Sequence, residues 1–181
     1  MKAQKSRLTL VLSLLAFNTS ILFSADTSHG DTRQRLEKEV RHELVMLPFY
    51  GIFDNLAFQI DGAKVTLLGQ AINPTLKADA ERQVKRIDGV ESIENKIEVL
   101  PLSPNDDRIR LAVFRAIYEH TALTRYALRA VPTIHIIVKN GHVTLEGSVA
   151  NQADKSISGI QANAVAGVFS VNNALRVDAE K

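Results

Sequence analysis

The chain lacks cysteine and tryptophan, and aromatic residues make up only 6% of its 181 residues. The absence of cysteine excludes disulfides, thiolate metal ligands, a catalytic thiol and a lipid-modified cysteine. The sequence also contains no phosphate-binding glycine loop, no nucleophile elbow and no Gly-x-x-Gly nucleic-acid loop. Hydrophobic residues at 45% and charged residues at 23% are typical of a folded globular protein. We therefore expect one or two small domains with no enzymatic activity, no cofactor and no nucleic-acid partner.

The first 25 residues have the pattern of a secretory signal peptide. Lys2, Lys5 and Arg7 precede an apolar run at residues 8–17, and Ser24-Ala25 offers a small-residue cleavage site. The alternative is an uncleaved anchor, but a membrane span needs about 20 apolar residues and this run is shorter. Cleavage would remove three basic residues, changing 22 basic against 20 acidic residues to 19 against 20. The pattern favours export to the periplasm.

One hairpin pattern occurs twice. Asn140-Gly141 separates the β-branched run at residues 133–138 from Val143-Thr-Leu-Glu-Gly147, which predicts a hairpin with a type I′ turn. The pattern returns as Val65-Thr-Leu-Leu-Gly69, with a turn expected to be one residue longer. Residues 65–99 align with residues 143–177 without a gap, and 12 of the 35 pairs are identical. The sequence thus predicts two copies of one unit.

Each unit is expected to contain a helix, a hairpin, a second helix and a last strand. Alternating strands predict an α+β fold, in which each unit is a three-stranded sheet covered on one face by two helices. In the first unit we expect these elements at residues 31–47, 56–61, 64–69, 73–87 and 92–100. In the second we expect them at residues 106–120, 133–138, 143–148, 151–164 and 169–177, with a loop or short helical turn at residues 121–130.

The expected boundaries follow from capping and spacing signals. Leu36, Val40, Leu44 and Leu47 lie at helical spacing, and Asn73-Pro74 is typical of a helix start. Asp106 or Asp107 is expected to cap the first helix of the second unit. The resulting organisation is a signal peptide at residues 1–25, a polar tether at 26–32, repeat one at 31–100, a linker at 101–104 and repeat two at 105–177.

These ordered motifs resemble the BON domain, a module named for osmotically inducible and nodulation-associated bacterial proteins. The family pattern appears as Val143-Thr-Leu-Glu-Gly147 with Gly167-Val-Phe-Ser-Val-Asn-Asn173, and as Val65-Thr-Leu-Leu-Gly69 with Gly89-Val-Glu-Ser-Ile-Glu-Asn95. A signal peptide with tandem BON domains is similar to the periplasmic osmotic-stress proteins of the family. The resemblance implies binding to anionic phospholipid, maintenance of the cell envelope under stress, no catalytic residues, and mainly structural roles for the glycines and asparagines.

The helix expected at residues 106–120 has two apolar faces. On a helical wheel, one face is assigned to the core and contains Ile109, Ala112, Val113, Ala116, Ile117 and His120. The other carries Leu111, Phe114 and Tyr118, flanked by Arg108, Arg110 and Arg115. Two interpretations stay open for Arg125, Tyr126 and Arg129: they extend this lipid-binding stripe, or they lie in a solvated loop. The distribution of charge also favours a basic surface on repeat two. Residues 106–181 contain 9 basic and 7 acidic residues, whereas residues 31–101 contain 10 basic and 12 acidic residues.

An apolar stripe bounded by arginines suits an anionic lipid surface, to which each basic residue contributes about 1 kcal/mol. Two alternatives stay open. Phe114 and Tyr118 can instead pack against repeat one or a partner subunit, or the same surface can dock an envelope protein, as in an interaction or chaperone-like module. His135 and His142 flank the turn, but zinc needs three or four ligands. We therefore expect no metal site, and we expect His135 to be an ordinary surface residue.

Overall fold

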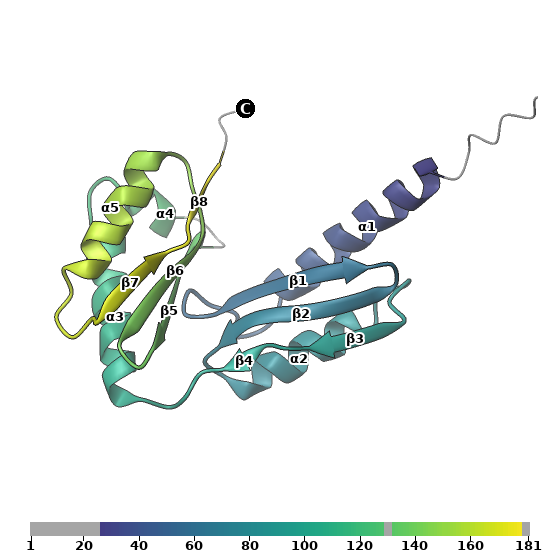
Figure 1. Ribbon diagram of the computed structural model, residues 1–181, viewed down its shortest axis with the longest axis horizontal. Coiled ribbons are helices and arrows are strands. Elements are labelled where there is room, and N and C mark those ends of the chain that lie inside the picture. The colour runs from purple at the N-terminus through teal and green to yellow at the C-terminus, as the bar shows by residue number, and fades with distance from the viewer. Residues whose placement is uncertain (1–25, 129–131, 179–181) are drawn as a thin grey trace, which may run out of the picture.

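The structure, a computed structural model, describes residues 26–128 and 132–178, in which the predicted α-β-β-α-β order occurs twice (Figure 1). The elements of repeat one are α1 (Asp26–Val45), β1 (Asn55–Asp61), β2 (Lys64–Ala71), α2 (Pro74–Val84), β3 (Ser92–Asn95) and β4 (Glu98–Val99). Those of repeat two are α3 (Pro104–Tyr118), α4 (Thr124–Ala127), β5 (Ile134–Lys139), β6 (His142–Val149), α5 (Gln152–Asn163), β7 (Ser170–Asn173) and β8 (Arg176–Val177). The predicted fold class of two tandem α+β units is confirmed.

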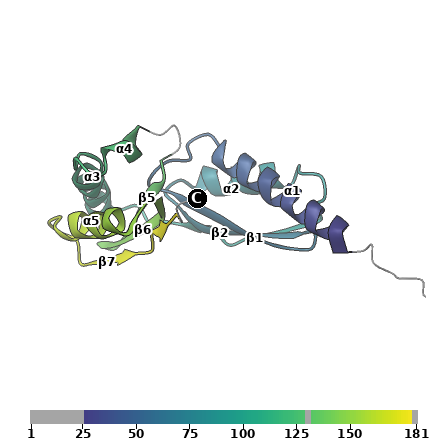
Figure 2. The ribbon, with the colours of Figure 1, turned by 90° about the horizontal axis from the view of Figure 1, so that it is seen from above.

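Both sheets have the same mixed topology. In repeat one, β1 pairs antiparallel with β2, and β3 and β4 both pair parallel with β2. In repeat two, β5, β6, β7 and β8 repeat this arrangement. Figure 2 shows α1 and α2 together on one side of the sheet formed by β1 and β2. The strands β1 and β5 therefore form an outer edge of their respective sheets.

The last strand of each repeat is broken in two, whereas the sequence predicted one continuous strand. The side-chain amide of Asn95 donates to the Lys77 carbonyl at 3.0 Å, and its oxygen accepts from the Ile97 amide at 3.2 Å. Asn173 binds Lys155 and Leu175 in the same way, at 2.7 and 3.4 Å. The break turns Ile97 and Leu175 into the core, where they are 1% and 0% exposed. The asparagine of the repeated motif is therefore structural.

The predicted starts of α2 and α5 are confirmed, whereas those of α1 and α3 are not. Asn73 caps α2 with Pro74 at the first position, and Asn151 caps α5. The predicted caps of α3 are wrong, because Ser103 accepts the Asp106 amide at 3.2 Å and Pro104 follows it. The predicted polar tether is also wrong, because residues 26–32 belong to α1.

The carboxylate of Asp106 has a different role. It accepts the amides of Asn140 and Gly141, both at 2.8 Å, and so holds the hairpin turn against the start of α3. The turn is a two-residue loop with positive φ at both central residues, 52° and 79°, as a type I′ turn requires.

The turn of repeat one was expected to be one residue longer than that of repeat two, but the two turns have the same length. Asp61 pairs with Lys64, so this loop also has two residues, and its glycine occupies the first central position with φ of 58°. A glycine at that position fits a type II′ turn. The shifted glycine, rather than an insertion, explains the different appearance of the two sequences.

Each repeat has its own core. The predicted face of α1, with Leu36, Val40, Leu44 and Leu47, is buried against the β2 residues Val65 and Leu67 and against residues of α2. The core of repeat two contains Ile109, Val113 and Ile117 of α3 and the inner residues of β5 and β6. Two separate cores agree with the duplication seen in the sequence.

Two glycines with positive φ, Gly147 in β6 and Gly62 in the turn of repeat one, allow a stability prediction. A Cβ on Gly147, which has φ of 106°, would lie 2.0 Å from the Thr133 carbonyl oxygen, whereas a Cβ on Gly62 meets nothing within 4 Å. We expect Gly147→Ala to lower the free energy of unfolding by more than about 3 kcal/mol. Gly62→Ala should cost less, about 1–2 kcal/mol, because it strains the backbone at positive φ without a clash. Urea denaturation measures both, and equal losses would contradict this account.

Candidate functional site

The predicted lipid-facing stripe of α3 is mostly not on the surface. Leu111 is 49% exposed, but Phe114 is half-buried and Tyr118 is only 5% exposed. The Phe114 ring packs edge-on against Phe53 of repeat one, with the ring centroids 6.4 Å apart. The Tyr118 hydroxyl donates to the Ile134 carbonyl at 2.6 Å, and burial raises the pKa of Tyr118 to about 12. The alternative in which Phe114 packs against repeat one is therefore confirmed.

Three further residues of the predicted site behave differently from expectation. Arg110 is 4% exposed and donates to the Val138 carbonyl at 2.7 Å. Tyr126 is 1% exposed, and its hydroxyl donates to Asp154 at 2.5 Å. Arg125 is exposed but forms a salt bridge with the same Asp154 carboxylate. Contact with lipid by Arg110, Tyr118 or Tyr126 is a wrong prediction, because these side chains are buried, and Arg129 lies outside the described residues.

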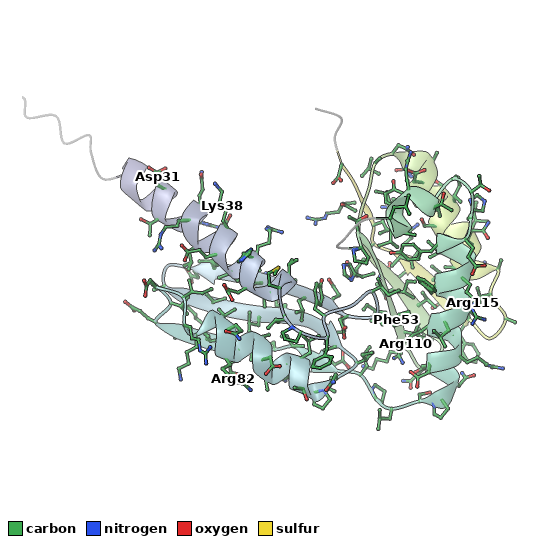
Figure 3. The ribbon with its side chains drawn as sticks, turned by 180° about the vertical axis from the view of Figure 1, so that it is seen from behind. Asp31, Lys38, Phe53, Arg82, Arg110 and Arg115 are labelled. Carbon is green, nitrogen blue, oxygen red and sulfur yellow. The ribbon has the colours of Figure 1, made fainter. Side chains whose placement is uncertain are left out.

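The lipid-contact prediction failed because the buried face of α3 lies further around the helix axis than the helical wheel indicated. Ile109, Val113 and Ile117 are buried as predicted, but Ala112, Ala116 and His120 of the expected core face are only partly buried. The buried arc is displaced from the alanines toward Arg110 and Phe114. This side of α3 faces repeat one, and Figure 3 shows Phe53 and Arg110 in this region.

Residues 50–54, which we call the docking segment, provide the cover. They precede β1, form a turn and contact the outer edge of β5, where the Ile136 amide donates to the Ile52 carbonyl at 2.7 Å. Ile52 and Phe53 pack against the core of repeat two. The Asp54 carboxylate holds the segment by accepting the amides of Gly51 at 3.0 Å and Ile72 at 2.8 Å. The docking segment thus joins the repeats through both backbone and apolar contacts.

His135 belongs to this junction and is not the surface residue that was expected. It is 8% exposed, and its ring stacks on Tyr50 with the centroids 5.5 Å apart. Its Nδ1 atom lies 3.3 Å from the Gly51 carbonyl oxygen. Burial lowers the pKa of His135 and raises the pKa of Asp54, which lies in the same junction. The junction therefore favours the neutral form of the imidazole.

The docking segment was not predicted from the sequence, although its composition contains a signal for it. The residues Phe49-Tyr-Gly-Ile-Phe53 are mostly apolar or aromatic, yet they fall between a predicted helix and a predicted strand. Connecting segments are usually polar and lie on the surface. An apolar connection of this kind indicates that the loop packs against another part of the molecule.

Part of the predicted site does remain accessible. Arg108, Leu111 and Arg115 are exposed and follow one another at helical spacing, and we call them the outer α3 stripe. Arg115 lies on the side of α3 that faces away from repeat one (Figure 3). The neighbouring Asp107 is neutralised by its salt bridge to Arg110. The outer α3 stripe is therefore a small basic surface with one apolar residue at its centre.

Within residues 26–128 and 132–178, no group of three or more histidine, aspartate and glutamate side chains is placed to hold a metal ion. No helix in these ranges has the length and apolar character needed to cross a bilayer.

The buried imidazole gives a pH prediction. Because the folded-state pKa of His135 lies below its usual value of about 6.5, its contribution to stability is present above pH 6.5 and lost as pH falls toward the folded-state pKa. We expect His135→Phe, which keeps a ring against Tyr50, to lose less stability than the wild type between pH 7.5 and pH 5.5. Urea denaturation at each pH tests this, with Asp54 common to both proteins, and parallel pH profiles would contradict it.

The BON domain family profile matches residues 32–101 and again residues 105–179. A comparison with curated proteins gives no match. Two solved structures of CdsD, a structural protein of the type III secretion system of Chlamydia trachomatis, are similar to this chain. The first is 15% identical, covering 80% of this chain and 94% of that chain; the second, a C-terminal domain, is 14% identical, covering 79% and 97%.

Both CdsD structures have TM-scores of 0.29, so they carry no argument about this chain. The family profile does, because its two matches cover most of the sequence and coincide with the two structural repeats. The chain belongs to the BON domain family and carries two BON domains in tandem.

Proposed function

We propose that this protein is a non-enzymatic periplasmic binding protein that associates peripherally with anionic phospholipid and helps to maintain the envelope under stress. The observation that carries the proposal is the tandem pair of BON domains, since this family is generally non-enzymatic and associates with membranes or lipids. The secretory pattern of residues 1–25, which lie outside the described residues, supports a periplasmic location.

The outer α3 stripe is the surface we assign to the membrane. Two arginines flank a half-exposed leucine, an arrangement in which guanidinium groups reach lipid phosphates while the apolar group enters the interface. Each basic residue contributes about 1 kcal/mol near an anionic surface, so Arg108 and Arg115 together supply about 2 kcal/mol. Since Phe114 packs against repeat one and Tyr118 is buried within repeat two, binding is expected to be weak and sensitive to salt.

Vesicle co-sedimentation tests this assignment. We expect the full chain to bind phosphatidylglycerol-containing vesicles at low salt and to bind phosphatidylcholine vesicles poorly. The Arg108→Glu/Arg115→Glu variant should bind at least about tenfold more weakly, because two attractions become repulsions. The fraction of protein in the pellet is measured at low and high salt.

A matched control keeps the same change in charge but moves it to repeat one. Lys38 and Lys85 are exposed on α1 and near the end of α2, so Lys38→Glu/Lys85→Glu should bind almost like the wild type. Full vesicle binding by the α3 variant at both salt concentrations would reject the outer α3 stripe. Concentration-dependent oligomerisation without lipid affinity would favour a protein-interaction module instead.

A further inference from the structure

The two repeats differ in how far their equivalent edge strands, β1 and β5, are covered. The shared register makes Leu56, Phe58 and Ile60 equivalent to Ile134, Ile136 and Val138. The three β5 side chains are 0% exposed, whereas all three β1 side chains are only partly buried. These equivalent side chains are therefore fully buried in repeat two and partly accessible in repeat one.

Helix α3 packs more closely on β5 than α1 does on β1. The docking segment adds to this cover of the β5 row. It brings Ile52 and Phe53 against that row and gives the outward-facing Ile136 amide a backbone acceptor. By the shared register, the amides of Phe58 and Ile60 also point away from β2, and no backbone acceptor for them occurs among the described residues. The β1 edge thus presents outward-facing backbone amides of the kind that the docking segment satisfies at Ile136 on the β5 edge.

A groove lies beside this open edge. It has a volume of about 940 Å³ and is bounded by all seven residues of β1, by residues of α1 and by residues of repeat two, among them Glu146 and Arg176. The α1 residues of the groove are Arg33, Glu37, Arg41, Leu44 and Val45. At one end it reaches Tyr50 and His135, so it continues directly from the junction between the repeats. At about 3.3 Å per residue, the length of β1 accommodates an extended chain of about six residues.

We propose that this groove, which we call the β1 groove, binds an extended peptide segment of another protein, which pairs with the open edge of β1. Strand addition of this kind satisfies exposed edge amides, while alternate side chains of the peptide enter apolar pockets. The molecule already contains a related contact, since the Ile136 amide on the equivalent edge of β5 donates to Ile52 of the docking segment, although that segment forms a turn and not a strand. This site is separate from the outer α3 stripe and does not depend on lipid binding.

The groove defines the chemistry of the peptide. The partly buried row of Leu56, Phe58 and Ile60 calls for apolar side chains at alternate positions. Arg33 is paired with Glu37, but Arg41 forms no salt bridge within the described residues, and its guanidinium carbon lies 5.6 Å from the centre of the Phe58 ring. A carboxylate on the peptide would find its partner in Arg41.

A synthetic peptide that copies residues 48–56 of this chain is the probe, because that sequence contains the segment seated on β5. The labelled peptide is titrated with the full chain by fluorescence anisotropy, and the amides that shift are mapped by NMR. We expect saturable binding with shifts concentrated in β1. Ile60→Lys should weaken binding at least about tenfold, because an inward-pointing charge blocks an edge.

Thr66→Lys is the matched control, because Thr66 lies on β2 opposite Gln59, on the other face of the sheet and outside the groove. It should leave binding unchanged. If circular dichroism shows that Ile60→Lys does not fold, the Arg41→Glu variant replaces it and should weaken binding of this aspartate-containing peptide severalfold.

Three results would overturn the proposal. The first is the absence of saturable binding to the wild type, and the second is full affinity in the folded Ile60→Lys or Arg41→Glu variant. The third is a shift pattern confined to β5, which would mean that the peptide only exchanges with the docking segment. Shifts in β1 produced by phosphatidylglycerol vesicles and not by the peptide would make the groove a lipid site and would also reject the proposal.

Discussion

The hydrogen bond between the Ile136 amide and the Ile52 carbonyl, with the apolar contacts around it, determines how the two repeats meet. A buried amide without an acceptor costs about 1–3 kcal/mol, so the exposed edge of β5 needs such a partner once it is covered. The docking segment supplies the acceptor and brings Phe53 against Phe114. As a result, the stripe of α3 that looked suited to a membrane is largely used inside the molecule.

This arrangement separates the two surfaces on which our functional proposals rest. On repeat two, the docking segment covers the inner side of α3 and leaves Arg108, Leu111 and Arg115 exposed on the outer side. On repeat one, no described residue accepts the outward-facing backbone amides of Phe58 and Ile60, and a groove of about 940 Å³ lies beside β1. Duplication of one unit has therefore produced two edges of the same design, one of which is closed by the chain itself.

Features that depend on neighbouring residues were predictable from the sequence. Asn140-Gly141 gave the turn, Asn73 and Asn151 gave helix caps, and the spacing of Leu36 and Val40 gave the core face of α1. Each of these follows from backbone geometry or periodicity within a short stretch. The repeated motifs also led to the family, because their order is kept in both copies.

Features that depend on distant residues were not predictable in the same way. His135 alternates with inward-facing residues and was assigned to the surface, but Tyr50, 85 positions away, stacks on its ring. Likewise, α3 has two apolar faces on the helical wheel, and the second is partly buried because Phe53 of repeat one packs against Phe114. Periodicity identifies apolar faces, but it does not say which element of the fold covers each one.

The central claim is that the chain closes the edge of β5 and leaves that of β1 open, and amide hydrogen exchange tests it most directly. Ile136 and Phe58 occupy equivalent positions, so each serves as a reference for the other. We expect the Ile136 amide to exchange at least about 100-fold more slowly than the Phe58 amide in the full chain, because only Ile136 donates to the docking segment. Equal exchange rates at the two positions would contradict the account.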